Sequence, residues 1–426
     1  MPTTTSPFAT LKADVFGVPA AEIAGRFGTP TYVYDAETIG RRVFDLRAFD
    51  LVRYAQKANS TLAVLDVVRR AGAVVDAVSV GEAKRAIAAG YSFGQDPPEI
   101  VYTADIFDRE SLDFVVQAQI PCNCGSADMI DQLGARMPGV PITLRINPGF
   151  GHGHSRKTNT GGDHSKHGIW HEGLDDALER AAAHGMPVAG LHMHIGSGTD
   201  LEHLGQVAGA MEAAALRVGP QLESISAGGG LPVAYKEGQA EVDLDAYFRL
   251  WDAARNRLEA AFGHALRLEI EPGRYLVAEA GTLVAEVRAV KRVGGNTFVL
   301  LDAGFNNLAR PILYGAYHPM ALVPMDGDLE RPERDVVVGG PLCESGDIFT
   351  QDEGGYVGTR LLPEARVGDL LLIERAGAYG FAMGSNYNGK PLAAEVLVRG
   401  GKASLCRARQ VFEDLVRGEV IPPPDA

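Results

Sequence analysis

Short apolar segments alternate with longer amphipathic segments from residue 36 to about residue 283. In the longer segments, such as 81–90, 126–136 and 244–262, apolar residues recur every three or four positions, which predicts helices with one buried face. The short segments are nearly continuous in apolar and small residues, as expected for parallel strands that are covered on both faces. The predicted strands cover residues 51–57, 73–79, 99–104, 120–124, 141–147, 188–195, 222–229 and 266–273. Strands that alternate with helices in this number favour a closed (β/α)8 barrel over an open doubly wound sheet.

The pattern changes after about residue 283. Gly-rich turns now separate segments that are typical of strands and hairpins, which predicts a second, mainly β domain. These segments cover residues 282–304, 332–340, 369–377 and 392–410. We therefore expect an α/β chain with a barrel over residues 36–283 and a β domain over residues 284–426, joined by the N-terminal segment 1–35. The lone strand expected at 29–36 is a candidate for the same sheet.

The composition is that of a globular protein with a large core, since 46% of the residues are hydrophobic and 22% are charged. The net charge of −14 disfavours binding to nucleic acid or to an anionic membrane, because both need a positive face. No stretch of about 18 apolar residues offers a membrane span, and the N-terminus lacks the pattern of a signal peptide. The cysteines have neither the spacing of a disulfide framework nor a Cys-x-x-Cys pair; they are Cys122, Cys124, Cys343 and Cys406. These features predict a reduced, cytoplasmic compartment.

Polar residues recur at the C-terminal ends of the predicted strands, which is the edge where barrel enzymes place their reacting groups. Buried polar groups are costly, so their recurrence at one end of a sheet indicates a site rather than a random scatter. The residues in question are Lys57, Asp76, Ser79, His194, Ser197, Gly228, Gly229, Gly230, Glu271 and Arg274.

Three of these features together match one cofactor. Lys57 alone fits either a surface lysine or, in a desolvated pocket, an amine that forms a Schiff base with an aldehyde. The triplet 228–230 fits either a flexible turn or a loop whose N–H groups approach a phosphate. Arg274 supplies a cation for the same anion, and Glu271 supplies a carboxylate that can keep a pyridine nitrogen protonated. A lysine, a phosphate cradle and this carboxylate are what pyridoxal 5′-phosphate (PLP) requires.

The segment "HMHIGSG" at 192–198 raises the question of a metal site. His192 and His194 are two apart on a strand and so share one face, but no carboxylate or thiol at suitable spacing completes a ligand set. We predict no metal. We interpret His194 as a flat ring stacked on the cofactor, Ser197 as a phosphate contact, and His192 as a core histidine with satisfied hydrogen bonds.

The segment "GPLCESGD" at 340–347 places a thiol beside a carboxylate, Cys343 and Glu344. Taken alone, Cys343 fits small hydrophobic filling, a metal ligand, a nucleophile or a proton donor. The neighbouring sequence does not decide among these roles.

A set of motifs in a fixed order extends over almost the whole chain. They are "YAQKAN" (54–59), "DAVSVGE" (76–82), "NPGFGHGHSRKTNTGG" (147–162), "HMHIGSG" (192–198), "SAGGGL" (226–231), "EIEPGR" (269–274), "ARPILYGAYH" (309–318), "GPLCESGD" (340–347) and "GAYG" (377–380). Each motif is weak alone, but the ordered set is specific. By these motifs the chain closely resembles the diaminopimelate decarboxylases, which belong to the fold III PLP enzymes.

The resemblance implies a barrel of the alanine racemase-like type and a set of residue roles. The residues it implies as catalytic are Lys57, which would bond to PLP, and Cys343, which would be the proton donor. The residues it implies around PLP are Lys57, Asp76, His194, Ser197, Gly228, Gly229, Gly230, Glu271, Arg274 and Tyr379. The residues it implies around the substrate are Arg274, Arg310, Tyr314, Glu344 and Tyr379. Many family members have Phe where this chain has His167, so we assign His167 no role.

The resemblance also implies a homodimer in which the "CES" loop of one subunit completes the site of the other. The implied reaction is decarboxylation of meso-2,6-diaminopimelate to L-lysine and CO2, the last step of lysine biosynthesis. The alternatives are another fold III basic amino-acid decarboxylase, an amino-acid racemase, and a non-catalytic PLP-binding homologue. A racemase needs a second base, and non-catalytic homologues tend to lose the lysine or the thiol, both of which are present here.

Overall fold

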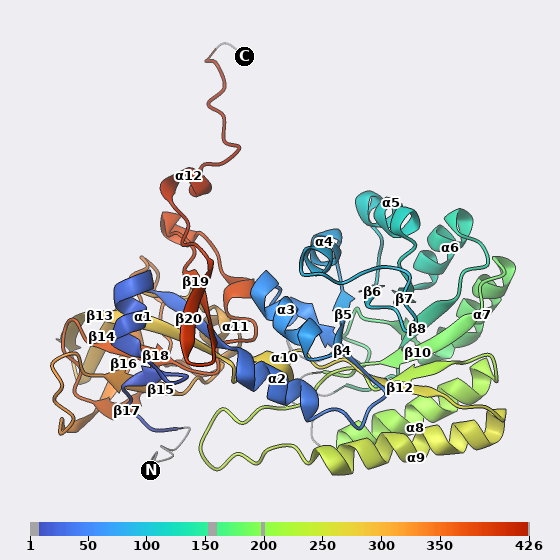
Figure 1. Cartoon of the computed structure of the whole chain (residues 1–426), viewed down its shortest axis with the longest axis horizontal. Helices are drawn as coiled ribbons and strands as arrows, with labels where there is room; N and C mark the ends of the chain where they lie inside the picture. Colours follow the sequence, from blue (N-terminus) through green and yellow to red (C-terminus); the bar gives the residue numbers. More distant parts are fainter. Residues whose placement is uncertain (1–7, 152–159, 197–200, 425–426) are drawn as a thin grey trace. The chain divides into compact units, whose positions relative to one another are not determined.

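The computed structural model describes residues 8–151, 160–196 and 201–424. The chain forms two compact units, both drawn in Figure 1. The barrel unit comprises Thr38–Ala234 and Ala240–Val277, and the β unit comprises Met1–Glu37, Tyr235–Gln239 and Ala278–Ala426.

The barrel unit is built on a ring of parallel strands. Each neighbouring pair is parallel, and the pairing of β10 with β8 closes the ring. The strands of the ring are β4 (Leu51–Ala55), β5 (Val74–Ala77), β6 (Ile100–Ala104), β7 (Cys122–Cys124), β8 (Ile142–Asn147), β10 (Val188–Met193), β11 (Ser224–Ser226) and β12 (Arg267–Ile270). The short strand β9 (Ile169–Trp170) adds to β8 outside the ring. The predicted closed (β/α)8 barrel is confirmed.

Helices surround the ring (Figure 1). They are α2 (Ala36–Phe44), α3 (Leu62–Arg70), α4 (Val80–Ala88), α5 (Arg109–Ala118), α6 (Ala127–Arg136), α7 (Leu174–Ala183), α8 (Leu201–Val218), α9 (Leu244–Phe262) and the short α10 (Arg274–Val277). Side-chain caps start several of them: Ser79 Oγ accepts the N–H of Glu82, and Ser126 Oγ accepts the N–H of Met129. In α9 the buried residues recur at helical spacing, as the sequence pattern predicts; they are Tyr247, Trp251, Ala254 and Leu258. No helix within the described ranges is long and apolar enough to cross a membrane.

The interior of the ring is more polar than the sequence pattern suggests. Side chains alternate along a strand, so every second residue points inward, and many of the inward residues are charged or polar. The buried ones include Arg53, Asp76, Thr103, Asn123, Arg145, Asn147, His192, Ser226, Glu269 and Glu271. Polar groups are thus present at the C-terminal strand ends, as expected, and they also continue down the inside of the barrel.

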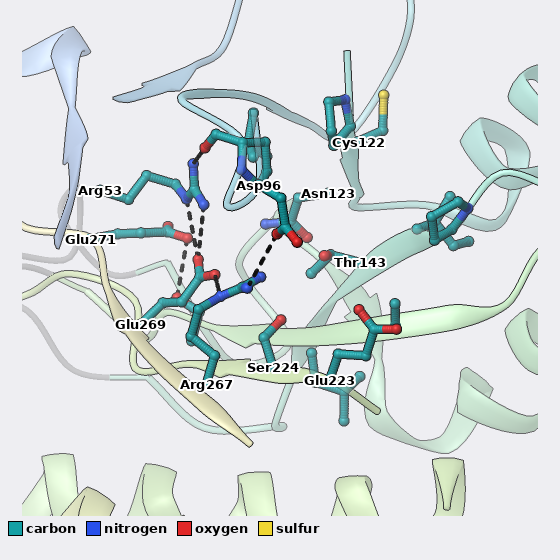
Figure 2. Close-up of a pocket in the computed structure, with 18 residues that line it drawn as sticks. Arg53, Asp96, Cys122, Asn123, Thr143, Glu223, Ser224, Arg267, Glu269 and Glu271 are labelled. Atoms are coloured by element: carbon teal, nitrogen blue, oxygen red, sulfur yellow. Dashed lines mark hydrogen bonds and ion pairs between the residues drawn. The ribbon is translucent and has the colours of Figure 1, made fainter. Parts of the chain in front are cut away.

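A buried ion cluster lies inside the barrel, toward the N-terminal strand ends. Figure 2 shows Glu269 between two arginines. Its Oε2 accepts from Nε and Nη2 of Arg53 at 3.2 and 3.1 Å, and its Oε1 accepts from Nε of Arg267 at 2.8 Å. The side chains of Arg53 and Glu269 are only 3% and 9% exposed, so their charges can be tolerated only because they are paired. A cavity of about 180 Å³ opens here and reaches up to Glu271.

The β unit is a second sheet that draws strands from both ends of the chain. Its main path runs β17 (Arg360–Pro363), β16 (Glu333–Gly339), β14 (Asn296–Leu301), β13 (Gly281–Val293), β3 (Thr31–Asp35), β19 (Ala394–Arg399), β20 (Lys402–Arg407). Off this path, β18 (Leu370–Ile373) pairs with β13 and with β15 (Met320–Val323). The remaining elements include β1 (Asp14–Val15), β2 (Val18–Pro19), α1 (Ala20–Phe27), α11 (Arg310–Tyr314) and α12 (Phe412–Leu415). Strand β3 thus joins this sheet between β13 and β19.

The ion cluster gives a stability prediction. Replacing Glu269 with Met leaves the buried guanidinium of Arg53 without its carboxylate, so we expect the chain without cofactor to lose about 3–5 kcal/mol of unfolding free energy, measured as a lower urea midpoint. Replacing Arg53 by Met in the same chain should recover part of the loss.

The matched control is Glu212→Met, which breaks an ion pair with Arg257, whose side chain is 58% exposed. We expect this change to cost no more than about 1 kcal/mol. Equal midpoints for Glu269→Met and Glu212→Met would show that the internal cluster contributes nothing beyond an exposed pair.

Candidate active site

Lys57 lies at the C-terminal mouth of the barrel. It is the middle residue of a 3-10 turn, η1 (Gln56–Ala58), that follows β4 directly. Gln56 and Ala58 are buried, whereas Lys57 is exposed. The chain alone therefore does not provide the desolvated pocket that the sequence analysis pictured for this amine, and the amine is accessible to an aldehyde.

Glu271 follows β12 and is buried, with both carboxylate oxygens close to donors. The Oγ of Ser226 donates to Oε1 at 3.1 Å, and Nε2 of His192 lies 2.7 Å from Oε2. Burial alone would raise the pKa of Glu271. This effect is outweighed by His192, by the charge of Arg53 and by the hydrogen bond from Ser226, so that the pKa of Glu271 is lowered to about 2. Glu271 is thus a buried carboxylate that stays ionised.

Asp76, at the end of β5, has the opposite electrostatic setting. Burial and the negative charge of Glu271 raise its pKa to about 7, against weaker opposing effects of Thr103 and Lys57. Two nearby acids that share one environment therefore differ in protonation near neutral pH. Such a separation is typical of sites in which one acid holds charge and another holds a proton.

His194 follows β10 at the same mouth and is half-buried. Burial, with the positive charges of Arg145 and Lys57, holds the pKa of His194 well below its ordinary range. Its ring is therefore neutral, which suits a flat stacking surface. Arg145 itself is buried on β8.

The glycine triplet is required by close packing and not only by a turn. A Cβ added to any of the three glycines would collide with a backbone carbonyl oxygen. For Gly228 that oxygen belongs to Met193, at 2.2 Å. For Gly229 it belongs to Glu271 and for Gly230 to Gly196, both at 2.6 Å. Gly228 and Gly230 also have positive φ angles, +60° and +105°.

The three N–H groups of the triplet are not equivalent. The N–H of Gly228 donates to Ser226 Oγ at 3.2 Å. Among the described residues, no acceptor is found for the N–H groups of Gly229 and Gly230. These two N–H groups are therefore candidates for binding an anion. Arg274, which follows Glu271 in the motif "EPGR" after the next strand, begins α10 and is buried. Ser197, the other predicted phosphate contact, lies outside the described residues.

The described ends of the loop 149–168 are tied to the barrel mouth. Asn147 donates from Nδ2 to the carbonyl of Gly162 at 3.0 Å and accepts the N–H of Gly162 at 2.9 Å. Thr160 donates its hydroxyl to the carbonyl of His194 at 3.1 Å. His167, which was given no role, lies 2.7 Å from Asp105, Nδ1 to Oδ2. The histidines of "HGH" at 152–154 lie outside the described residues.

In the β unit, Arg310 is buried and fixed at the start of α11. Its Nη1 donates to the hydroxyl of Tyr235 at 3.2 Å and lies 2.9 Å from Nε2 of His318. Nδ1 of His318 lies 2.9 Å from the carbonyl oxygen of Glu374, so that nitrogen carries the proton and Nε2 accepts from Arg310. The phenol of Tyr235 and the imidazole of His318 thus hold the head of Arg310 in place. Tyr314 ends the same helix and is half-buried.

Tyr379 lies in a strained turn of the β unit. Its φ is +57°, a region that non-glycine residues rarely adopt. A Cβ on the following Gly380 would lie 2.3 Å from the carbonyl oxygen of Ala376, so the turn is closely packed. Strain of this kind persists where the surroundings fix the backbone, often at a functional position.

Cys343 and Glu344 are exposed on a loop of the β unit that is held firmly at its base. The buried carboxylate of Asp347 accepts the N–H of Leu342 at 2.8 Å and that of Phe305 at 2.7 Å. The N–H of Cys343 donates to Asn388 at 2.7 Å. The thiol is therefore not hydrophobic filling, which corrects the simplest interpretation of this residue.

The described residues hold no group of three or more His, Cys, Asp or Glu side chains suited to a metal. They do fit PLP: an accessible amine, two N–H groups on glycines where a side chain would clash, a buried cation at the start of a helix, and an ionised carboxylate. Sequence reasoning missed the roles of Arg145 and Ser226 and the contact of His192. The signal for all three was the period of two that places them inside the barrel.

Comparison with known proteins gives a consistent result. A family model described as "Pyridoxal-dependent decarboxylase, pyridoxal binding domain" matches residues 41–278. The chain is 52% identical to a diaminopimelate decarboxylase of Escherichia coli strain K12 over 401 residues, covering 94% of this chain and 96% of that one. It is 53% identical to a diaminopimelate decarboxylase of Streptomyces coelicolor over 405 residues, covering 95% and 92%. A crystal structure of a diaminopimelate decarboxylase matches with a TM-score of 0.92 at 50% identity, covering 96% and 98%.

The raised pKa of Asp76 gives a pH-dependent prediction. Below about pH 4 the carboxyl of Asp76 is protonated in both the folded and the unfolded chain. Between about pH 4 and pH 7 only the unfolded chain loses this proton, so the free energy of unfolding decreases as the pH rises. Asp76→Asn removes this penalty. We expect its stability advantage without cofactor to grow from pH 4 to 7, to at most about 4 kcal/mol, and then to level off.

Urea titrations of both chains at several pH values measure this difference. Asp245→Asn, at the exposed start of α9, is the control and should give a nearly constant difference. A constant difference for Asp76→Asn as well would mean that Asp76 titrates as an exposed acid does.

Proposed function

This chain belongs to the diaminopimelate decarboxylases, and we propose that the two groups of residues described above divide the work of that reaction between them. The chain is a PLP-dependent carboxy-lyase that converts meso-2,6-diaminopimelate to L-lysine and CO2. In our proposal the barrel mouth holds the cofactor, and residues of the β unit recognise the far end of the substrate. The observation that carries the first assignment is the buried carboxylate of Glu271, with the hydroxyl of Ser226 donating to one oxygen and His192 2.7 Å from the other.

When bound, PLP supplies an aldehyde carbon for amines and a pyridinium ring that accepts electron density. Lys57 provides the amine that holds the cofactor and yields its place to the substrate amine. Its exposure supports this role, because the exchange needs an accessible amine. The N–H groups of Gly229 and Gly230, with Ser197 and Arg274, bind the phosphate. The neutral ring of His194 stacks on the pyridine ring.

Glu271 holds a proton on the pyridine nitrogen. An ionised carboxylate is acceptor-only, and with one donor on each oxygen it still has lone pairs for a further N–H. Its charge would stabilise the positive charge on that ring nitrogen. Asp76, whose pKa is raised to about 7, carries less than a full negative charge near neutral pH and would contact the cofactor partly as a neutral acid.

The substrate is bound by five residues: Arg274, Arg310, Tyr314, Glu344 and Tyr379. Meso-diaminopimelate carries a second carboxylate and a second ammonium group at its far end. Arg310 suits that carboxylate because its planar head donates in a fixed direction, and Glu344 suits the ammonium. A substrate that lacks either group would leave one of these charges unpaired, which favours diaminopimelate over lysine or ornithine.

Cys343 delivers the proton that replaces CO2 on the α-carbon. As a thiol it can act as a general acid, and a firmly held loop fixes its position. We further propose that the chain forms a homodimer in which Cys343 and Glu344 complete the partner's site. Their exposure on a single subunit supports this, since groups meant for a neighbouring chain lie on the surface. Four cysteines without a disulfide are in keeping with a cytoplasmic enzyme.

Complementation tests the shared site. Cys343→Ala should bind PLP while its turnover falls by about 100-fold or more, and Lys57→Ala should lose the absorbance of the bound cofactor. Neither homodimer is active, but a mixed dimer keeps one site with both groups. After random exchange of equal amounts, we expect about a quarter of the wild-type CO2 release.

The control is Cys406→Ala, which removes a half-buried thiol on β20 and should leave turnover unchanged. If proven subunit exchange gives no recovery, each subunit uses its own Cys343 and the shared site is wrong. If Cys343→Ala itself has normal turnover, the thiol is not the proton donor.

A further inference from the structure

His192 contacts Glu271 inside the barrel, and the sequence analysis treated it only as a core histidine. It is 2% exposed, and its Nε2 lies 2.7 Å from Oε2 of Glu271. Strand pairing places it level with Arg145 on β8 and with Ser226 on β11. It is therefore central to the polar interior and not at its edge.

We propose that His192 is a positioning residue for the reaction: its Nε2–H donates to Glu271, so that Glu271 and not Asp76 carries the negative charge. The proposal rests on the proposed function, in which Glu271 faces the pyridine nitrogen. His192 does not touch the reacting atoms, and it acts through the carboxylate.

The direction of the hydrogen bond follows from the two partners. An ionised carboxylate can only accept, so the proton between the two groups belongs to Nε2. Both ring nitrogens are buried and neither meets the geometry of a full hydrogen bond in the described part of the chain, but Nε2 is the one that lies 2.7 Å from a carboxylate oxygen. A proton on Nε2 therefore points to the nearest acceptor, Oε2 of Glu271.

The other groups around Glu271 cannot replace this donor. Ser226 already donates to the opposite oxygen, Oε1, and also accepts the N–H of Gly228. Arg53 directs Nε and Nη2 to Glu269 and Nη1 to the carbonyl oxygen of Pro98 at 3.0 Å. Arg53 thus acts on Glu271 through space, whereas His192 supplies the close contact at Oε2.

The choice between the two acids explains why this donor matters. Asp76 and Glu271 repel each other when both are ionised, so near neutral pH one of them holds a proton. Donors gather around Glu271, whereas Oδ1 of Asp76 is buried without a partner in the described residues. Removing the donor at Oε2 would shift the proton toward Glu271, and the pyridine nitrogen would lose its counter-charge.

The facing charges come from several strands, so a substitution at position 192 must be read against them. Arg145 lies beside His192 on β8, and Glu269 lies beyond Ser226 on β12. Lys57 and Arg53 come from the β4 side, and Asp76 comes from β5. None of these groups changes in the experiment below, which alters only the donor.

The test compares three variants at position 192 in the intact enzyme loaded with PLP labelled with ¹⁵N at the pyridine position. His192→Gln places an amide N–H where Nε2 lies, whereas His192→Asn is too short to reach Oε2, and His192→Leu has no donor. We expect the ¹⁵N resonance to move toward the unprotonated position in Asn and Leu but not in Gln. The kcat should fall about 10-fold or more in Asn and Leu, and far less in Gln.

The outcomes separate the possible explanations. A ¹⁵N resonance and kcat at wild-type values in both Asn and Leu would overturn the role of His192, even if the variants were less stable. If Leu does not fold, the contrast between Asn and Gln decides. His184→Gln, a substitution outside the ring at the end of α7, is the control and should change neither readout. Wild-type enzyme that binds no PLP or releases no CO2 would instead defeat the proposed function itself.

Discussion

The structure depends on one electrostatic requirement, which is that a carboxylate inside the barrel must stay ionised. Burial penalises the charged form of Glu271, and the barrel offsets this with Ser226 on one oxygen, His192 on the other and the charge of Arg53. Arg53 in turn needs Glu269 to remain buried. The polar interior is therefore one connected arrangement, and it explains why charged residues occupy strand positions that would otherwise be apolar.

The same arrangement connects Glu271 to the glycine triplet. Ser226 accepts the N–H of Gly228 while it donates to Glu271, so the loop that we propose for the phosphate and the carboxylate that we propose for the pyridine nitrogen share one side chain. The glycines leave no room for a Cβ against the neighbouring backbone. In the β unit, His318 fixes Arg310 and Asp347 fixes the loop that carries Cys343 in an equally local way. Buried neighbours thus hold Glu271, Arg310 and the loop of Cys343, three of the groups that we propose for the reaction.

Much of this could be predicted from the sequence, and the rest had physical reasons to be missed. The helices and strands could be predicted from the spacing of apolar residues, because a helix with one buried face and a strand with two buried faces give different spacings. The residues at the strand ends follow from the predicted strands. The contact of His192 with Glu271 could not be predicted in this way, because it joins residues that are distant in sequence. The exposure of Lys57 and the anchoring of Cys343 through Asn388 also depend on how the chain packs. Local pattern indicates which residue types are available, and only packing decides which of them meet.

Glu271→Gln tests the central requirement most directly, because it removes the charge and keeps the shape. The measurement is CO2 release from meso-diaminopimelate in a single turnover, with the bound PLP counted in the same sample. If the charge on Glu271 supports the reaction, the variant retains PLP and the rate falls by about 100-fold or more. A wild-type rate with full PLP content would contradict this, and the ionised carboxylate would then be a structural feature of the barrel without a part in the chemistry.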